Sequence, residues 1–182
     1  IPKRFADAVP AIPEVGQWVA DVVHEAISES RQRNQAVTTI HDGQSLLLLG
    51  STGVGKTHAA YGAMRAISLL GIHTRWQVIS AADLYARLRP RHGIDSEQEF
   101  QTIAGAPVLV VDDLGAAKAS EWVEEVNFRL VNTRYETVRP TLFTSNLPPK
   151  QLASALGDRV ASRLVEMTTQ VAIKGDDRRR TR

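Results

Sequence analysis

The sequence contains no cysteine, and aromatic residues make up only 5% of its 182 positions. The absence of cysteine excludes disulfide bonds and thiolate metal sites, and it suits a reducing compartment. The sequence also lacks any apolar run near the ~18 residues that a membrane-spanning helix needs. Since 43% of the residues are hydrophobic, we expect a soluble protein with an ordinary globular core.

A strong net charge is absent as well, because 22 basic residues are nearly balanced by 20 acidic ones, which leaves a net charge of +2. Residues 174–182 hold five basic and two acidic side chains, so the rest of the chain carries a net charge of −1. A body so close to neutral does not attract nucleic acid through its overall charge. Any nucleic-acid binding must come from a local patch, or from charge summed over several copies.

The length fits one domain, which we divide into three segments. Residues 1–44 form an arm and a helix, residues 45–175 the core, and residues 176–182 a basic tail. The first residue is Ile and no secretory pattern follows it, so we expect that the sequence starts inside a longer natural chain.

Short apolar runs alternate with helical patterns along the core. The apolar runs are typical of strands buried on both faces, and they lie at 45–50, 74–80, 107–115, 140–146 and 168–175. The helical patterns lie at 15–33, 57–71, 80–90, 96–105, 121–138 and 158–166. Five strands alternating with helices predict an α/β fold with a mainly parallel sheet and helices on both faces.

A turn punctuated by glycine follows the first predicted strand. Gly50, Gly55, Lys56 and Thr57 match the pattern G-x-x-x-x-G-K-[ST] between a strand and a helix. In such a turn the backbone N–H groups and the positive end of the helix attract phosphate. Lys56 would reach the β- and γ-phosphates, and the Thr57 hydroxyl would ligate Mg²⁺. The predicted nucleotide loop comprises Gly50, Ser51, Thr52, Gly53, Val54, Gly55, Lys56, Thr57 and His58.

Polar residues end two further predicted strands. Asp112 and Asp113 follow four apolar residues, and Asn146 ends the run 140–146. We expect Asp112 to hold Mg²⁺ through its water shell, and Asp113 to orient or deprotonate the attacking water. Asn146 would donate a hydrogen bond to the γ-phosphate or to that water. The alternatives are that both acids belong to an ordinary strand-end turn, and that Asn146 is a turn residue before Leu-Pro-Pro.

Two arginines, Arg159 and Arg163, are four residues apart and so lie on one face of a predicted helix. Arginines with this spacing usually make surface ion pairs. The alternative is an arginine finger that reaches the γ-phosphate of a neighbouring subunit, which accelerates hydrolysis roughly 10³–10⁵-fold where it has been dissected.

Taken together, these motifs resemble the AAA+ ATPases of the DnaC/DnaI-type helicase-loader group, whose relatives include the IstB transposition helper proteins. The resemblance covers nearly the whole chain. It rests on the arm at 1–8, the Walker A segment at 50–57, the Walker B segment at 109–115, the sensor-1 segment at 132–148 and the finger segment at 156–164.

The resemblance implies a P-loop NTPase of the AAA+ (ASCE) type, a three-layer sandwich around a five-stranded sheet of order 5-1-4-3-2. It implies ATP and Mg²⁺ as ligands and self-association into a ring, spiral or filament with active sites between subunits. In this family the arm closes over the adenine, which makes Phe5 a candidate contact. Arg163 stands at the finger position, and Arg159 is the second choice.

The resemblance also implies partners, namely a DnaB-like replicative helicase and single-stranded DNA, with no membrane involved. It places the protein in the cytoplasm of a bacterial cell, or of the bacterial host if a phage encodes it. Loaders carry a further N-terminal segment that grips the helicase, and we expect it to be absent from this chain.

The C-terminal end departs from the AAA+ pattern. Many AAA+ proteins have a helical lid with a sensor-2 arginine after the fifth strand, whereas here only GDDRRRTR follows, which predicts a reduced or absent lid. This tail resembles a Gly-x-Ser-x-Arg ending common in the loaders, with Asp177 at the serine position and Arg179 last.

Candidate DNA contacts are basic residues after the second strand and after the Walker B segment, namely Arg87, Arg89, Arg91, His92 and Lys118. The alternative is a solvated helix face and loop. Single-strand binding normally adds aromatic platforms, and only Tyr85 and Trp76 lie nearby in the sequence.

Four functions compete. The first is an ATP-binding and ATP-hydrolysing loader that delivers the helicase to single-stranded DNA in replication initiation, and the second is a transposition helper ATPase that binds duplex DNA and a transposase. A P-loop small-molecule kinase is the third, but the sequence shows no basic lid tied to an acceptor-binding motif. The fourth is a nucleotide-binding interaction module that does not hydrolyse ATP.

Overall fold

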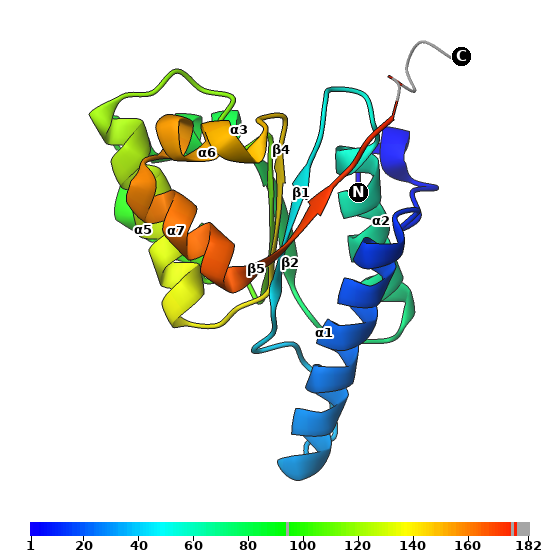
Figure 1. Cartoon of the computed structure of the whole chain (residues 1–182). Helices are drawn as coiled ribbons and strands as arrows, with labels where there is room; N and C mark the ends of the chain where they lie inside the picture. Colours follow the sequence, from blue (N-terminus) through cyan, green and yellow to red (C-terminus); the bar gives the residue numbers. More distant parts are fainter. Residues whose placement is uncertain (94, 176, 178–182) are drawn as a thin grey trace.

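The computed structural model describes residues 1–93, 95–175 and 177, and it alternates strands with helices along the core (Figure 1). The strands are β1 (Ser45–Leu49), β2 (Trp76–Ser80), β3 (Val108–Asp112), β4 (Thr141–Ser145) and β5 (Thr168–Ala172). The predicted basic tail, residues 176–182 with Arg179, lies outside the described residues except for Asp177.

The helices include one α-helix and one short 3₁₀ helix that were not predicted from the sequence. They are the short 3₁₀ helix η1 (Lys3–Phe5), α1 (Pro13–Gln32), α2 (Lys56–Leu69), α3 (Ala81–Leu88), α4 (Ser96–Ala104), α5 (Glu121–Glu136), α6 (Pro149–Leu156) and α7 (Asp158–Met167). The unexpected α-helix is α6, which has only eight residues and begins at Pro149, where a sequence pattern indicates a turn. None of the helices in the described part of the chain is long and apolar enough to cross a membrane.

The five strands are all parallel and lie in the order β2-β3-β4-β1-β5. Read from the other edge, this is the predicted order 5-1-4-3-2, so the predicted sheet is confirmed. Because parallel strands end at the same edge, the segments after β1, β3 and β4 are brought together there. These are the segments that carry the Walker A, Walker B and sensor-1 residues.

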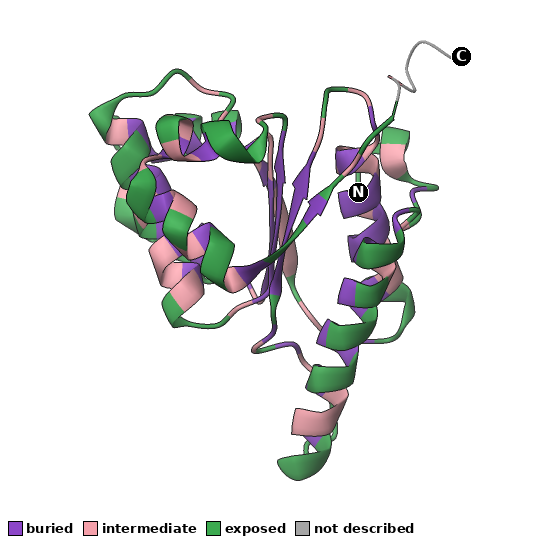
Figure 2. Ribbon diagram, viewed as in Figure 1, coloured by how far each residue is buried: buried purple, intermediate pink, exposed green. Residues whose placement is uncertain are grey.

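Helices cover both faces of the sheet. In Figure 1, α1 and α2 lie to the right of the sheet, and α3, α5, α6 and α7 lie to its left. Leu46 and Leu48 of β1 pack into the core under α1 and α2, while Leu47 and Leu49 pack into the core on the other face. Figure 2 shows the result, a sheet buried on both sides between the buried faces of the helices.

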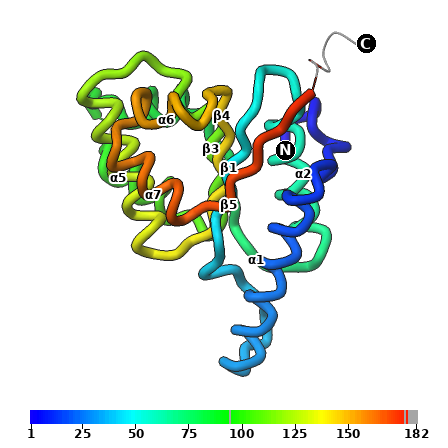
Figure 3. The backbone as a smooth tube through the Cα atoms, in the orientation of Figure 1, coloured from blue at the N-terminus to red at the C-terminus, as the bar shows by residue number. Residues whose placement is uncertain are grey.

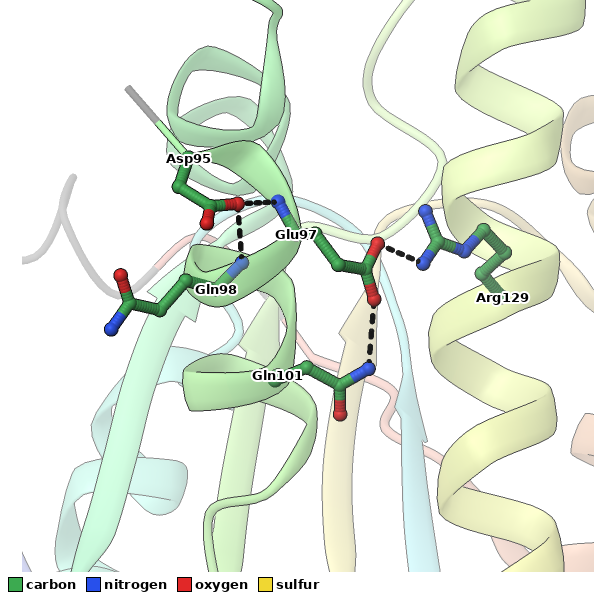
Figure 4. Close-up of polar contacts among 5 residues, drawn as sticks. All are labelled: Asp95, Glu97, Gln98, Gln101 and Arg129. Atoms are coloured by element: carbon green, nitrogen blue, oxygen red, sulfur yellow. Dashed lines mark hydrogen bonds and ion pairs between the residues drawn. The ribbon is translucent and has the colours of Figure 1, made fainter. Parts of the chain in front are cut away.

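The beginnings of several helices are capped by short polar side chains, which satisfy N–H groups that lack helical partners. Ser80 caps α3, because its hydroxyl accepts a hydrogen bond from the N–H of Asp83. Asp95 caps α4 in the same way, and Figure 4 shows its carboxylate accepting from the N–H groups of Glu97 and Gln98, both at 3.0 Å.

Arg134 of α5 is fully buried and ties the amino-terminal edge of the sheet together. Burial, with a smaller contribution from Arg139, lowers the pKa of its guanidinium to about 9. The cation is compensated by hydrogen bonds to oxygen atoms before β3 and around the start of β4, namely those of Ala104, Ala106, Pro107, Pro140 and the Thr141 hydroxyl.

We predict that Arg134→Met lowers the free energy of unfolding by about 3 kcal/mol, because several buried carbonyl groups lose their donor. Urea denaturation followed by circular dichroism measures this loss. The control is Arg129→Met on the same helix, whose exposed ion pair with Glu97 at 2.7 Å appears in Figure 4 and contributes little. Equal losses in the two variants would show that Arg134 does not brace the sheet.

Candidate functional site

The segment between β1 and α2 forms the predicted phosphate loop. Gly53 and Gly55 adopt φ values of 87° and 104°, a left-handed conformation that other residues rarely adopt. Gly55 directly precedes α2, which begins at Lys56, one residue before the predicted helical pattern 57–71. The loop therefore winds into the N-terminal end of a helix, where free backbone N–H groups attract anions.

Lys56 is only 5% exposed, and its ammonium group is held inside this loop. Nζ donates hydrogen bonds to the carbonyl oxygens of Gly50 at 2.7 Å and Ser51 at 2.9 Å. It also donates to Oδ1 of Asn146, 2.6 Å away and 90 residues later in the chain. The structure thus joins two of the predicted site residues directly.

Asn146 also reaches the Walker B turn. Its amide nitrogen Nδ2 donates to Oδ1 of Asp113 at 2.9 Å, while its Oδ1 accepts from Lys56. Lys56, Asn146 and Asp113 therefore form one hydrogen-bonded chain across the carboxyl edge of the sheet. Asn146 therefore contacts two of the other predicted site residues.

Thr57 and Asp112 form the second pair of the site. The Thr57 hydroxyl lies 3.1 Å and 3.0 Å from the two carboxylate oxygens of Asp112. A hydroxyl and a carboxylate this close can share one cation, and hard oxygen ligands are those that Mg²⁺ prefers. The described residues contain no group of three or more His, Asp or Glu suited to a metal ion. This donor set suits Mg²⁺ held partly by nucleotide phosphates, as is usual for that ion.

The environment of Asp112 favours a nearby cation. Burial raises the pKa of its carboxyl group, the repulsion by Asp113 adds to the rise, and hydrogen bonds from Thr144 and Thr57 together with the charge of Lys56 oppose it. A cation beside this carboxylate would stabilise the ionised form. The residues present therefore fit a divalent metal ion.

Thr144 belongs to this site, and the sequence analysis missed it. Its hydroxyl donates to Oδ1 of Asp112 at 2.6 Å and accepts from the backbone N–H of Asp113 at 3.0 Å. Its only sequence signal is a polar residue inside the apolar run 140–146. A threonine is also common in strands for its shape alone, so that signal is weak.

The N-terminal arm lies on α2 near the loop. The ring of Phe5 stacks on Tyr61, with centroids 4.4 Å apart and an interplanar angle of 13°. His58 meets the same ring edge-on at a centroid distance of 6.4 Å. Burial, and to a smaller extent the charge of Asp112, raises the pKa of Tyr61. The structure thus brings Phe5 and His58 together at the start of α2.

The two candidate finger arginines lie far from this loop in the fold. Arg163 on α7 lies over two rings of α5, 5.4 Å from the Phe128 centroid and 5.1 Å from that of Tyr135. Arg159 lies 5.8 Å from the Phe128 centroid. Helices α5 and α7 cover the face of the sheet opposite α2 (Figure 1). The isolated chain therefore does not bring either arginine to its own phosphate loop.

The candidate DNA contacts are all exposed and lie on or after α3 and before α5. Arg87 is in the last turn of α3, Arg91 follows it in a loop, and Lys118 precedes α5. Arg89 lies 5.5 Å from the ring centroid of Trp122. Of the two aromatic residues considered as platforms, Tyr85 is buried, with its hydroxyl bound to Asn127 at 2.8 Å, and cannot stack on a base.

Comparison with known proteins decides the family. A sequence profile described as "IstB-like ATP binding protein" matches residues 23–182. The chain belongs to this family. It is 26% identical over 144 residues to the replicative helicase loader DnaC of Escherichia coli strain K12, an alignment that covers 76% of this chain and 56% of the relative.

Two further similarities agree with this assignment. The chain is 28% identical over 148 residues to an insertion sequence IS21 putative ATP-binding protein of Pseudomonas aeruginosa, covering 77% of this chain and 54% of that protein. The crystal structure of the DnaC helicase loader matches with a TM-score of 0.71 and 29% identity over 94% of this chain and 99% of that one. The chain spans about half the length of the curated relatives it matches.

These similarities confirm the resemblance to the helicase-loader group and its IstB relatives, and they confirm the AAA+ fold class. The family description also makes the chain an ATP-binding protein. The phosphate loop of this IstB-like domain is therefore the place where the triphosphate is expected.

The C-terminal segment of the IstB-like domain returns to the same loop. After β5 the chain runs up toward the start of α2 (Figure 3). A Cβ atom placed on Gly53 would lie 1.8 Å from Oδ1 of Asp177, so this carboxylate lies directly against the loop. The described residues after β5 form no helix. A carboxylate in this position repels the phosphate groups that the loop attracts.

We predict that Asp177→Asn strengthens ATP binding about three- to tenfold, because a unit negative charge a few ångström from the triphosphate is removed. Calorimetric titration at low salt measures the change. Glu136→Gln makes the same charge change at the exposed end of α5 and should leave the affinity unchanged. Equal affinities for wild type and Asp177→Asn would contradict this role of the tail.

Proposed function

We propose that the chain hydrolyses ATP and acts as a helicase loader, delivering a DnaB-like replicative helicase to single-stranded DNA during replication initiation. The observation that carries the proposal is the hydrogen-bonded chain Lys56–Asn146–Asp113 beside the pair Thr57–Asp112. This arrangement occurs in a fold that matches the DnaC helicase loader over 99% of its solved chain.

Binding of ATP would reorganise the loop around Lys56. The backbone N–H groups of residues 53–57 and the positive end of α2 would hold the phosphates. Lys56 would exchange the carbonyl oxygens of Gly50 and Ser51 for phosphate oxygens, which carry more negative charge. Thr57 and Asp112 would hold Mg²⁺, which supplies charge neutralisation at the β- and γ-phosphates.

Asp113 and Asn146 would act on the attacking water. The Asp113 carboxylate would orient the water and accept its proton as the oxygen attacks the γ-phosphorus and ADP leaves. Asn146 contacts both Lys56 and Asp113, so movement of Lys56 onto the phosphates would release the Asn146 oxygen. The freed oxygen would then accept a hydrogen bond from the attacking water, and the second N–H of the Asn146 amide would donate to the γ-phosphate, so that Asn146 reports the state of the nucleotide to β4.

A neighbouring copy of the chain would supply the arginine finger for the γ-phosphate. Arg163 is half-buried on α7, and Arg159, the second choice, is exposed. Both lie on the face opposite α2, so they would reach the loop only of another subunit (Figure 1). Self-association would therefore bury the γ-phosphate between two copies. This requirement couples hydrolysis to assembly around single-stranded DNA, for which Arg87, Arg89, Arg91 and Lys118 are the candidate contacts.

The alternative function is a transposition helper that binds duplex DNA and a transposase. The observation that favours it is the family profile together with 28% identity to the IS21 protein. Sizing of the protein with a slowly hydrolysed ATP analogue, in the presence of single-stranded or duplex DNA, separates the two. Assembly on single strands and binding of a replicative helicase support the loader, whereas filaments on duplex support the helper.

We predict that Lys56→Ala abolishes ATP binding, whereas Asp113→Asn keeps the affinity and lowers kcat at least about 100-fold, because only the latter leaves the phosphate contacts intact. Fluorescent-nucleotide titration and phosphate release measure the two quantities. The chain is a non-hydrolysing nucleotide-binding module if both substitutions act only by weakening ATP binding. The same conclusion follows if wild type releases no phosphate.

We predict that mixing Lys56→Ala with Arg163→Ala restores part of the ATPase activity that each variant lacks alone. In a mixed assembly, the Arg163 of a Lys56→Ala subunit can serve an intact phosphate loop on its neighbour. Mixtures at rising protein concentration measure the recovery. The control is Arg129→Ala, which removes an exposed arginine of α5 and should leave the ATPase activity unchanged. Absence of recovery at every ratio would contradict a finger supplied by the neighbour.

A further inference from the structure

Thr144 lies in the interior of β4, between β3 and β1, and is fully buried. Its backbone oxygen accepts a hydrogen bond from the N–H of Leu114 at 2.8 Å, just after the Walker B carboxylates. The strand meets the Walker B turn at Thr144 and at the next residue, Ser145, whose hydroxyl donates to the carbonyl oxygen of Leu114 at 2.7 Å. The sensor-1 segment at 132–148 includes Thr144, but the sequence analysis gives its side chain no role.

The Thr144 hydroxyl makes two hydrogen bonds with fixed directions. It donates its single proton to Oδ1 of Asp112 at 2.6 Å, and it accepts the N–H of Asp113 at 3.0 Å. A hydroxyl has one donor, so the bond to the carboxylate leaves its lone pairs for the backbone of Asp113. The two hydrogen-bond partners of the Thr144 hydroxyl are thus the two acids that the sequence analysis predicts to be functional.

The bond to Asp113 holds an unfavourable backbone conformation. Asp113 has a φ of 57°, in the left-handed region that residues other than glycine rarely adopt. Two bonds from the turn to Thr144, one through its hydroxyl and one through its carbonyl, support this conformation. This turn also directs the Asp113 carboxylate toward Asn146, whose amide nitrogen donates a hydrogen bond to it. Such strain persists only where surrounding contacts enforce it.

The bond to Asp112 fixes the other carboxylate. Oδ1 receives the Thr144 hydroxyl at 2.6 Å, and both oxygens lie within reach of Thr57. The Asp112 carboxylate is therefore oriented from two sides, by β4 and by α2. Loss of a group that orients a metal ligand in this way typically weakens metal binding about 10- to 100-fold.

We propose that Thr144 is a positioning residue of the Mg²⁺–nucleotide site, setting the direction of the Asp112 carboxylate and the turn at Asp113. This inference rests on the proposed function, because it assigns Asp112 to the metal and Asp113 to the water. Thr144 touches neither ligand and acts only through the two aspartates.

The test compares Thr144→Val, which keeps the shape and removes the hydroxyl, with Thr144→Ser, which restores the hydroxyl. The matched control is Thr141→Val on the same strand, because Thr141 is equally buried and its hydroxyl binds Arg134 at 2.7 Å and the Arg139 carbonyl at 3.1 Å, away from the site. If Thr144→Val does not fold, Thr144→Ala replaces it.

Two readouts separate positioning from simple stability. The first is the affinity for a non-hydrolysable ATP analogue with Mg²⁺ and in EDTA, and the second is hydrogen exchange of the Asp113 amide in the nucleotide-free protein. We expect Thr144→Val to weaken Mg²⁺-dependent binding about 10- to 100-fold, to leave binding in EDTA unchanged, and to speed exchange at Asp113. Thr144→Ser should restore both properties, and Thr141→Val should lower the melting temperature without changing either.

The inference is overturned if Thr144→Val keeps the Mg²⁺ dependence of wild type, or if Thr141→Val loses it to the same extent. Equal losses with Mg²⁺ and in EDTA also overturn it, because they indicate a general disturbance of the phosphate loop. Failure of wild type itself to bind the analogue would instead refute the proposed function, so the two failures are distinguishable.

Discussion

The buried ammonium group of Lys56 at the start of α2 is the interaction on which the rest of the site depends. Burying a charge is costly unless it is compensated by hydrogen bonds. Here two loop carbonyls and the Asn146 oxygen accept from it. The loop must therefore wind tightly after β1, and β4 must lie beside β1 so that Asn146 reaches it. The parallel sheet and its strand order thus position one cation at the edge where a triphosphate is expected.

Much of this arrangement could be predicted because its signals are local. The spacing of Gly50, Gly55, Lys56 and Thr57 determines a loop and a helix start from a few consecutive residues. Continuous apolar runs before Asp112 indicated a strand with both faces buried, as found. The strand order came from the family resemblance, because no local pattern specifies which parallel strands become neighbours.

The contacts that were missed depend on residues brought together only by the fold. Arg134 lies in a helix whose sequence suggests an exposed arginine, yet it is fully buried among carbonyl groups. Thr144 carries the ordinary signature of a strand residue, and its role follows from Asp112 at the end of β3 and from Asp113, which follows the strand. Asp177 reaches Gly53 across more than 120 positions of sequence, so its proximity to the phosphate loop has no local signal. These cases share one cause: a side chain's partners lie on other elements.

The most direct measurement of the central claim is a crystal structure of the chain with Mg²⁺ and a non-hydrolysable ATP analogue. We expect the triphosphate against the backbone amides of residues 53–57, with Lys56 on phosphate oxygens and Thr57 and Asp112 around one metal ion. The account would be contradicted if the nucleotide bound elsewhere while Lys56 stayed on the carbonyl oxygens of Gly50 and Ser51.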